Sequence, residues 1–193
     1  LTVPAHGIAT VQVTADPTLA PTGTTLGGYV EASIDGDTVD RSGWGLVKEE
    51  ERYDLTLRAT DRQGNPGMTW VTLMEHDAAF PEAVPVEGET TLRLPAGTYT
   101  VLGFMDVVDA PDEAGLALLG EPALVLGANT VLELDAREAN LVSADVGDDT
   151  VTASHQRMEY WVGANALNGA AMVPVTVDNL YAAPTSPVPD GDF

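Results

Sequence analysis

Short alternations of apolar and polar residues dominate this chain, and they predict β-strands rather than helices. No window of helical length keeps an apolar i, i+3, i+4 pattern that is free of glycine and proline, although an amphipathic helix needs such a pattern. Strand patterns recur instead, and each one ends at glycine, proline, asparagine or aspartate. We therefore predict an all-β chain built from tandem β-sandwich modules.

Residues 1–50 are predicted to form a first β segment with one clear hairpin turn. Asp35-Gly36 is typical of a two-residue hairpin connection. The adjacent Gly27 and Gly28 predict either a bulge or the close approach of another chain segment. Strand patterns cover residues 8–14, 26–34, 38–39 and 44–47.

Residues 51–137 carry a denser series of strand patterns, which predicts a small sandwich. Turn residues in DRQGNPG, at 61–67, predict a hairpin that reverses the chain. In LPAGTYTV, at 94–101, Gly97 is expected to adopt a positive φ and Tyr99 to pack inward. The acid-rich segments 76–88 and 106–115 are predicted to be loops. The six expected strands cover residues 53–60, 69–75, 90–94, 98–106, 122–126 and 130–135.

Residues 138–193 show a weaker pattern and are predicted to form an additional β segment. Strands are expected at 150–154, 158–162 and 173–177. The proline-rich end from Tyr181 to Phe193 lacks periodicity, and it is interpreted as an extended linker or a lead-in to another module.

Two stretches resemble known β modules. Residues 53–136 resemble the carboxypeptidase-regulatory-like, or prealbumin-like, β-sandwich family, through Asp61-Arg62-Gln63-Gly64-Asn65-Pro66 and the segment from Leu94 to Val101. Residues 1–47 are similar to the last strands of a fibronectin-type-III-like module, through VPAHGIATVQVTAD and GGYVEAS. In this order the modules resemble the non-catalytic C-terminal region of large secreted subtilisin-like serine peptidases of actinobacteria.

This resemblance implies a secreted, accessory role that spaces, stabilises or targets a catalytic unit, with the rest of the parent polypeptide as partner. The Gly-Thr-Ser-Met-Ala nucleophile segment of a subtilisin-like domain is absent from the sequence. No catalytic residue is therefore transferred, and this chain is predicted not to be an enzyme. Residues 1–14 lack the basic and apolar regions of a signal peptide, so a leader is expected to have been removed or to lie upstream.

An alternative function is a carbohydrate-binding or cell-surface-binding module of the adhesin type. Trp44, Trp70 and Trp161, together with Tyr160, are the candidates for a stacking platform on a glycan or protein surface. Burial inside the sandwich is the simpler explanation for Trp44 and Trp70.

The composition and charge of the chain limit the classes of partner that it can bind. The chain has 30 Asp and Glu against 8 Lys and Arg, for a net charge of −22. Nucleic acid and anionic membranes are repelled by such a surface, and no apolar run is long enough to cross a bilayer. Without cysteine, neither disulfides nor a Cys-based zinc site can form.

Clustered carboxylates make calcium a candidate ligand, because Ca²⁺ prefers hard oxygen donors. None of the clusters matches the 12-residue EF-hand loop, and solvated acidic loops are the alternative interpretation. The candidate ligands are Asp35, Asp37 and Asp40 in one segment and Asp106, Asp109, Asp112 and Glu113 in another.

The histidines and Lys48 are candidates for two further kinds of chemistry, a catalytic triad and an isopeptide bond. The three histidines, His6, His76 and His155, show no spacing that assembles a catalytic triad, although spacing alone does not exclude one. Lys48 is a candidate for an isopeptide bond to Asn140, assisted by Glu50, as in related pilus and adhesin domains.

Overall fold

The computed structural model describes residues 6–76, 78, 80–110, 113–147, 150, 156–161, 170–172 and 177–188. Its elements there are strands and two short 3-10 helices, which confirms the all-β prediction. The chain divides into two compact units, Leu1–Glu51 and Arg52–Phe193. Among the described segments, no helix is long and apolar enough to cross a membrane.

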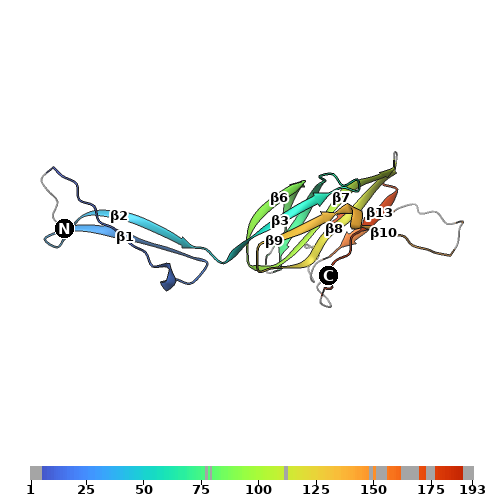
Figure 1. Ribbon diagram of the computed structural model, residues 1–193. Coiled ribbons are helices and arrows are strands. Elements are labelled where there is room, and N and C mark those ends of the chain that lie inside the picture. The colour runs from blue at the N-terminus through green and yellow to red at the C-terminus, as the bar shows by residue number, and fades with distance from the viewer. Residues whose placement is uncertain are drawn as a thin grey trace. The chain divides into compact units, whose positions relative to one another are not determined.

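The first unit is built around one long hairpin, drawn in blue in Figure 1. Strand β1 (Thr24–Ile34) pairs antiparallel with β2 (Asp37–Lys48), and no third described strand joins them. The turn residues Asp35 and Gly36 have φ values of 51° and 98°, so the Asp-Gly turn forms as predicted. A 3-10 helix, η1 (Pro17–Leu19), precedes the hairpin.

The strand predicted for residues 8–14 is wrong. The described backbone from residue 7 to 16 has no strand pairing, and Ile8 is 93% exposed. The apolar–polar alternation is present, but alternation does not supply a pairing partner, and the described part of this segment pairs with neither β1 nor β2. The alternation therefore indicates a strand-prone sequence that pairs with no described strand of this unit.

The glycines of β1 allow a close approach rather than a bulge. The Trp44 indole lies over Gly28, and its Cζ2 is 2.8 Å from the position that a Cβ of residue 28 would occupy. The bulge lies further along the strand, between Ala32 and Ser33. A side chain at position 28 would therefore displace the Trp44 ring.

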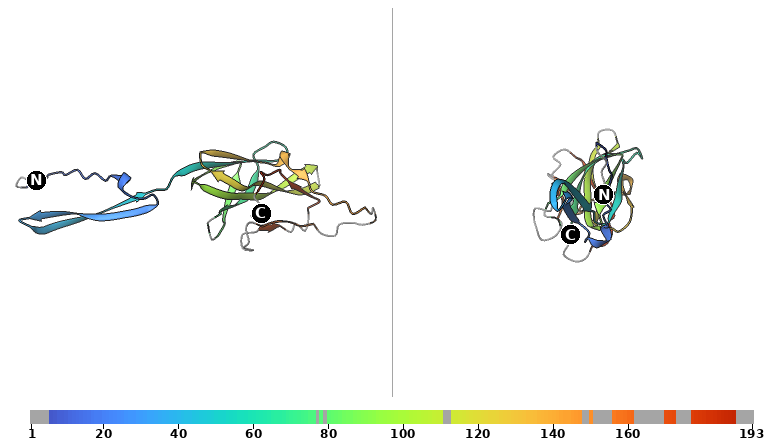
Figure 2. Two further views of the ribbon diagram at one scale, coloured as in Figure 1. Left: turned by 90° about the horizontal axis from the view of Figure 1, so that it is seen from below. Right: turned by 90° about the vertical axis from the view of Figure 1, so that its left-hand side faces the viewer.

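The second unit is a sandwich of two sheets (Figures 1 and 2). One sheet has the order β6-β3-β9, in which β3 is antiparallel to β6 and parallel to β9. The other has the order β10-β13-β8-β7-β4-β5. The strands are β3 (Arg52–Thr60), β4 (Met68–Glu75), β5 (Glu82–Glu87), β6 (Glu89–Pro95), β7 (Gly97–Ala110), β8 (Glu113–Leu126), β9 (Thr130–Asp135), β10 (Asn140–Leu141) and β13 (Asn179–Ala182). Outside these sheets lie a short pair, β11 (Met158–Tyr160) and β12 (Ala170–Met172), and the 3-10 helix η2 (Ala136–Glu138).

Side chains from both sheets form the core between them. On β3, Leu55, Leu57 and Ala59 are buried and point inward, as their alternation predicts. They belong to one cluster with buried residues of the six-stranded sheet and of the segment that follows β9. Representative members are Val71, Leu73, Val84, Val86, Tyr99, Val101, Met105, Leu119, Leu134 and Tyr181.

The DRQGNPG turn carries the chain from one sheet to the other and does not close a hairpin. It joins β3 to β4, which belong to different sheets, and a single bridge between Thr60 and Pro66 closes it. The Asp61 carboxylate accepts the backbone N–H of Gln63 at 2.9 Å and of Asn65 at 2.8 Å. Local turn chemistry was predicted correctly, but it does not determine which sheet the next strand joins.

The Pro95-Ala96-Gly97 turn crosses between the sheets in the same way, from β6 to β7. Gly97 does not have the expected positive φ. Tyr99 packs inward as predicted, and its hydroxyl donates a hydrogen bond to the Pro95 carbonyl at 2.9 Å. This hydrogen bond links the end of β6 to the start of β7 across the turn.

Both segments predicted to be acidic loops contain strand residues. Within 76–88, strand β5 forms the edge of the six-stranded sheet, where Val84 and Val86 point inward and Pro85 is tolerated. Within 106–115, β7 continues to Ala110 and β8 begins at Glu113. The acidic residues led to a loop prediction, but a strand with one solvated face can carry such residues on that face.

The described residues after 138 add strands to the second unit. Strand β13 pairs in parallel with β8, and Leu180 and Tyr181 are buried. Residues 181–188, expected to be an extended linker, are held to β8 by bonds such as Ser186 N–H to Glu121 Oε2 at 2.9 Å. Strand β11 covers residues 158–160 of the strand predicted at 158–162. Of the strands predicted at 150–154 and 173–177, residues 151–154 and 173–176 lie outside the described residues.

Candidate binding groove

The outer face of the six-stranded sheet carries a row of aromatic and apolar side chains. Register pairs Trp70 of β4 with Pro85 of β5 on one side and with Phe104 of β7 on the other, and it pairs Phe104 with Leu118 of β8. Paired residues on neighbouring strands point to the same face. These four side chains therefore form a continuous row across four strands.

The inward direction of the neighbouring residues explains why Trp70 points outward. Val71 and Leu73 are buried in the core, so Trp70 and Thr72 occupy the opposite face of β4. Trp70 is 57% exposed, and Phe104 is half-buried. The prediction that Trp70 lies buried inside the sandwich is wrong.

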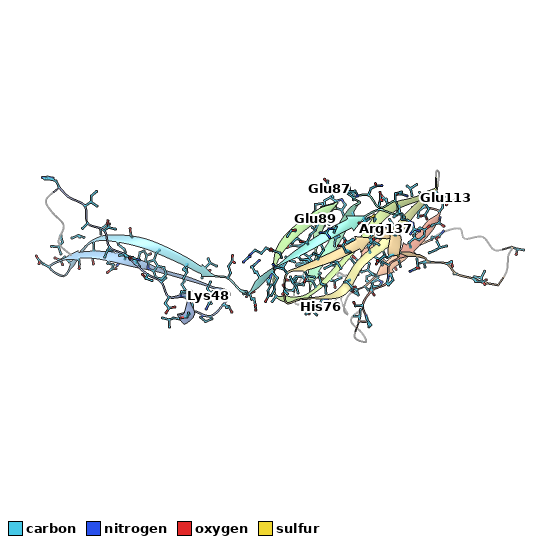
Figure 3. All side chains as sticks on the ribbon, viewed as in Figure 1. Lys48, His76, Glu87, Glu89, Glu113 and Arg137 are labelled. Atoms are coloured by element: carbon cyan, nitrogen blue, oxygen red, sulfur yellow. The ribbon has the colours of Figure 1, made fainter. Side chains whose placement is uncertain are left out.

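A second row, richer in carboxylates, lies two residues further along the same strands. Met68 pairs with Glu87 of β5, and Asp106 of β7 pairs with Leu116 of β8. Met68, Glu87 and Asp106 are exposed, whereas Leu116 is buried. Figure 3 labels Glu87, which belongs to the edge strand of this sheet.

A pocket of about 570 Å³ lies over these rows. Its lining includes Met68, Trp70, Thr72, Phe104, Asp106 and Leu116. We call this surface, together with the neighbouring Glu87, the Trp70 groove. An exposed indole within the apolar row, with two carboxylates in the second row, gives the groove both a stacking surface and hydrogen-bond acceptors.

Tyr160 of β11 covers the sheet on one side of the groove. It forms a small buried cluster with Met74 and Leu102, and its ring stacks on Phe104 with centroids 5.9 Å apart. Burial raises the pKa of the Tyr160 hydroxyl. Trp161, the next residue, is 46% exposed.

A second constellation joins four segments of the chain. The Arg62 guanidinium donates to the Asp109 carboxylate and, at 3.0 Å, to the Ala136 carbonyl. It also lies over the Tyr181 ring, 4.4 Å from the centroid. The Tyr181 hydroxyl donates to Asp109, and this hydrogen bond raises the pKa of Tyr181. The cluster ties the turn after β3, the end of β7, the 3-10 helix η2 and strand β13 together.

Calcium binding stays a prediction, and the described side chains do not form an assembled ligand set for it. Asp109 is engaged by Arg62 and Tyr181. In the described part of the chain, no three acidic or histidine side chains come together as metal ligands. The other candidates lie in β1–β2 (Asp35, Asp37, Asp40) and β7–β8 (Asp106, Glu113), while Asp112 lies outside the described residues.

The described histidines occupy separate surroundings. His6 is exposed, with a φ of 58°. His76, labelled in Figure 3 at the end of β4, has its Nε2 3.3 Å from Thr100 Oγ1. The Thr100 hydroxyl is buried and donates to the Pro122 carbonyl at 2.8 Å, which makes this a structural contact. His155 lies outside the described residues.

The proposed isopeptide partners each have another hydrogen bond. Lys48 Nζ donates to the Ala20 carbonyl at 2.6 Å, and Asn140 Nδ2 donates to the Glu138 carbonyl at 3.3 Å. Lys48 and Glu50 belong to the first unit and Asn140 to the second. The isopeptide bond stays a prediction.

The hairpin carries its own exposed aromatic residues. Trp44 is 42% exposed and Tyr29 is 65% exposed, so the expectation that Trp44 is buried is also wrong. The Arg41 guanidinium lies 5.0 Å above the Tyr29 ring and pairs with Glu31 on the opposite strand. Tyr29, Trp44 and glycines of both strands line a shallow hollow on the hairpin.

Sequence reasoning missed the Trp70 groove because its residues are brought together by pairing between strands. The one local signal was the alternation around Trp70, where Val71 and Leu73 mark the opposite face as the core. Comparison with known proteins gives no further guidance, since no protein-family model, curated protein or solved structure matches the chain.

Proposed function

We propose that this chain is an accessory, non-catalytic β region of a larger secreted protein, in which it spaces, stabilises or targets a subtilisin-like catalytic unit. The hairpin supports the proposal most strongly. A two-stranded hairpin is at best marginally stable in water unless other structure covers it. Every residue of β1 and β2 is at least partly exposed, so the hairpin is suited to complete a β-structure supplied by a neighbouring module.

One face of the hairpin has the pattern of an inner sandwich face. Register places Leu26 opposite Leu46 and Gly28 opposite Trp44, with Val30 two residues further along the same face. Such a face normally packs against a second sheet. The resemblance of residues 1–47 to a fibronectin-like module supplies the expected neighbour, namely the preceding strands of the parent protein.

Hydrogen–deuterium exchange tests the proposal. In the isolated 193-residue chain, the amides of β1 and β2 are expected to exchange much faster than those of β4 and β7, because local opening of an uncovered hairpin costs little. In the secreted parent protein the hairpin amides are expected to become protected. Equal protection of hairpin and sandwich in the isolated chain contradicts the role of the hairpin.

A fluorophosphonate probe, which labels activated serines, tests separately whether this chain is non-catalytic. The parent protein is expected to be labelled on its catalytic unit and not on this chain. Labelling of the isolated chain, or peptide hydrolysis by it, contradicts a non-catalytic role.

A second candidate function is a surface-binding module, and the exposed aromatic row favours it. Contiguous apolar surface on a folded domain often marks a binding site, and Trp70 presents more than half of its surface beside Phe104. The full chain is then expected to bind a cell or protein surface, and Trp70→Ala is expected to reduce the bound fraction. Trp44→Ala, in the other unit, serves as the control.

A further inference from the structure

We propose that the Trp70 groove binds a basic side chain, lysine or arginine, presented by an exposed segment of a partner protein. The proposal rests on the surface-binding function and names its ligand class. It follows from the chemistry of the aromatic row, from the charges beside it, and from the apolar floor between them.

The aromatic row supplies the first part of the recognition. A cation within about 6 Å of an indole face is attracted by the ring quadrupole, and tryptophan is the strongest of the aromatic side chains in this respect. Trp70 is exposed, yet it is flanked by Pro85 and Phe104 on the adjoining strands. These neighbours lie on either side of Trp70 on the same face, and the ring is accessible to a ligand.

The charges beside the row determine the sign of the charge that the ligand carries. Asp106 lines the pocket and Glu87 is paired in register with the lining residue Met68, and neither carboxylate makes an ion pair with a described residue. No lysine or arginine is found among the described residues that line the pocket. The chain as a whole carries −22. This field attracts a cationic ligand and repels phosphates and anionic glycans.

Asp61 is the other acidic residue at the pocket, and its carboxylate forms hydrogen bonds within its own turn. Asp61 accepts backbone N–H groups, chiefly that of Asn65, and these bonds lower its pKa. It therefore stays ionised and adds negative potential without being a direct ligand. Asp106 and Glu87 are the carboxylates that remain available to pair with an ammonium or guanidinium group.

Met68 lies on β4, between the two strands that carry these carboxylates, and completes the fit. It is exposed, and register places it opposite Glu87 on the strand that also carries Trp70. Its flexible thioether adapts to an aliphatic chain, and lysine and arginine lay their methylene stems along apolar surface while the charged end reaches a polar partner. A basic side chain can thus contact Met68 with its stem, Trp70 with its charge and Asp106 by an ion pair.

The test titrates trilysine amide into the full chain and follows the Trp70 indole and backbone amides by NMR. Saturable shifts confined to the Trp70 groove are expected, and Nε-acetylated trilysine amide, which lacks the side-chain charges, is expected to cause much smaller ones. Raising NaCl from about 50 to about 500 mM is expected to weaken binding, because salt screens exposed charges.

Variants separate the groove from the general acidity of the surface. Trp70→Ala is expected to weaken binding about fivefold or more, Trp70→Phe by less, and Asp106→Asn to reduce the salt dependence. The matched controls Trp44→Ala and Asp37→Asn change the same residue types in the other unit and are expected to leave the affinity unchanged. Thermal unfolding of each variant checks that the fold is retained.

Three results overturn the proposal. Equal binding by the Trp70 and Trp44 variants shows general attraction to an acidic surface. Binding of uncharged chitotriose at Trp70 without binding of trilysine amide replaces the basic ligand by a glycan and keeps the surface-binding function. No response of the groove to either probe removes both the ligand and the support for that function.

Discussion

The β1–β2 hairpin and the 52–193 sandwich are made of similar strands but differ in what covers them. In the hairpin no residue of either strand is fully buried, whereas β3 of the sandwich has Leu55 and Leu57 completely shielded from solvent. Both regions contain antiparallel strand pairs. Backbone pairing and alternation therefore make a strand, but a second sheet is needed to make a core.

The same contrast is found in two arginine–tyrosine pairs. In the hairpin, Arg41 stacks on Tyr29 and pairs with Glu31, and all three side chains are exposed. In the sandwich, Arg62 stacks on buried Tyr181 and pairs with the partly buried Asp109. Solvent screens the first arrangement far more than the second, so similar contacts are expected to differ in their contribution to stability.

The largest difference is expected from leucine truncation. Leu55→Ala leaves a cavity in a packed core and should lower the free energy of unfolding by roughly 2–5 kcal/mol. Leu46→Ala, in the half-exposed hairpin, should leave the unfolding of the sandwich almost unchanged. Urea unfolding followed by circular dichroism measures both. A comparable loss in the two variants would mean that the hairpin and sandwich unfold as one cooperative structure.

Two glycines with positive φ provide the next comparison. At Gly120, where φ is 119°, a Cβ would overlap the Val101 carbonyl, whereas at Gly36 nothing lies within 4 Å. Gly120→Ala therefore combines backbone strain with overpacking, and it should cost about 3 kcal/mol. Gly36→Ala should cost only the left-handed backbone penalty of roughly 1–2 kcal/mol, and this cost should be confined to the hairpin. Differential scanning calorimetry compares the two variants, and an equal shift of the sandwich transition contradicts the expectation.

Tyr181→Phe tests the buried arginine–tyrosine pair. Loss of the hydrogen bond to Asp109 should destabilise the sandwich by about 1 kcal/mol, whereas Tyr29→Phe should have no effect on it. Because the pKa of Tyr181 is raised in the folded chain, its contribution is complete below about pH 10 and is lost as the pH rises through the raised value. Urea unfolding at several alkaline pH values should therefore show a steeper loss for the unaltered chain than for Tyr181→Phe.

The smallest effect is expected at exposed ion pairs in either region. Arg58 bridges Glu89 at 2.9 Å and Glu133 at 2.8 Å across three strands, but all three side chains are about half exposed. Arg58→Ala should change the urea midpoint of the sandwich only slightly, because exposed pairs are screened. Arg41→Ala in the hairpin should change it even less. A large, salt-sensitive loss at Arg58 would show that the bridge acts as a cooperative network.

Local sequence patterns determined where many strands lie and which face of each points inward. The inward face of β3, the Asp35-Gly36 turn and the inward Tyr99 were predictable because each depends on residues that are neighbours in the sequence. Strand β5 was missed because its solvent-facing acids and Pro85 resemble a loop.

Only the tertiary structure decided how these strands combine. In the folded chain, the DRQGNPG turn connects the two sheets of the sandwich and does not close a hairpin. Residues 8–14 pair with none of the described strands. The tertiary structure also places Trp70 beside Phe104 and joins Asp109 to Tyr181 across 72 residues of sequence. The physical reason is that strand pairing and sheet packing are contacts between distant residues, and neither alternation nor turn chemistry specifies the partner.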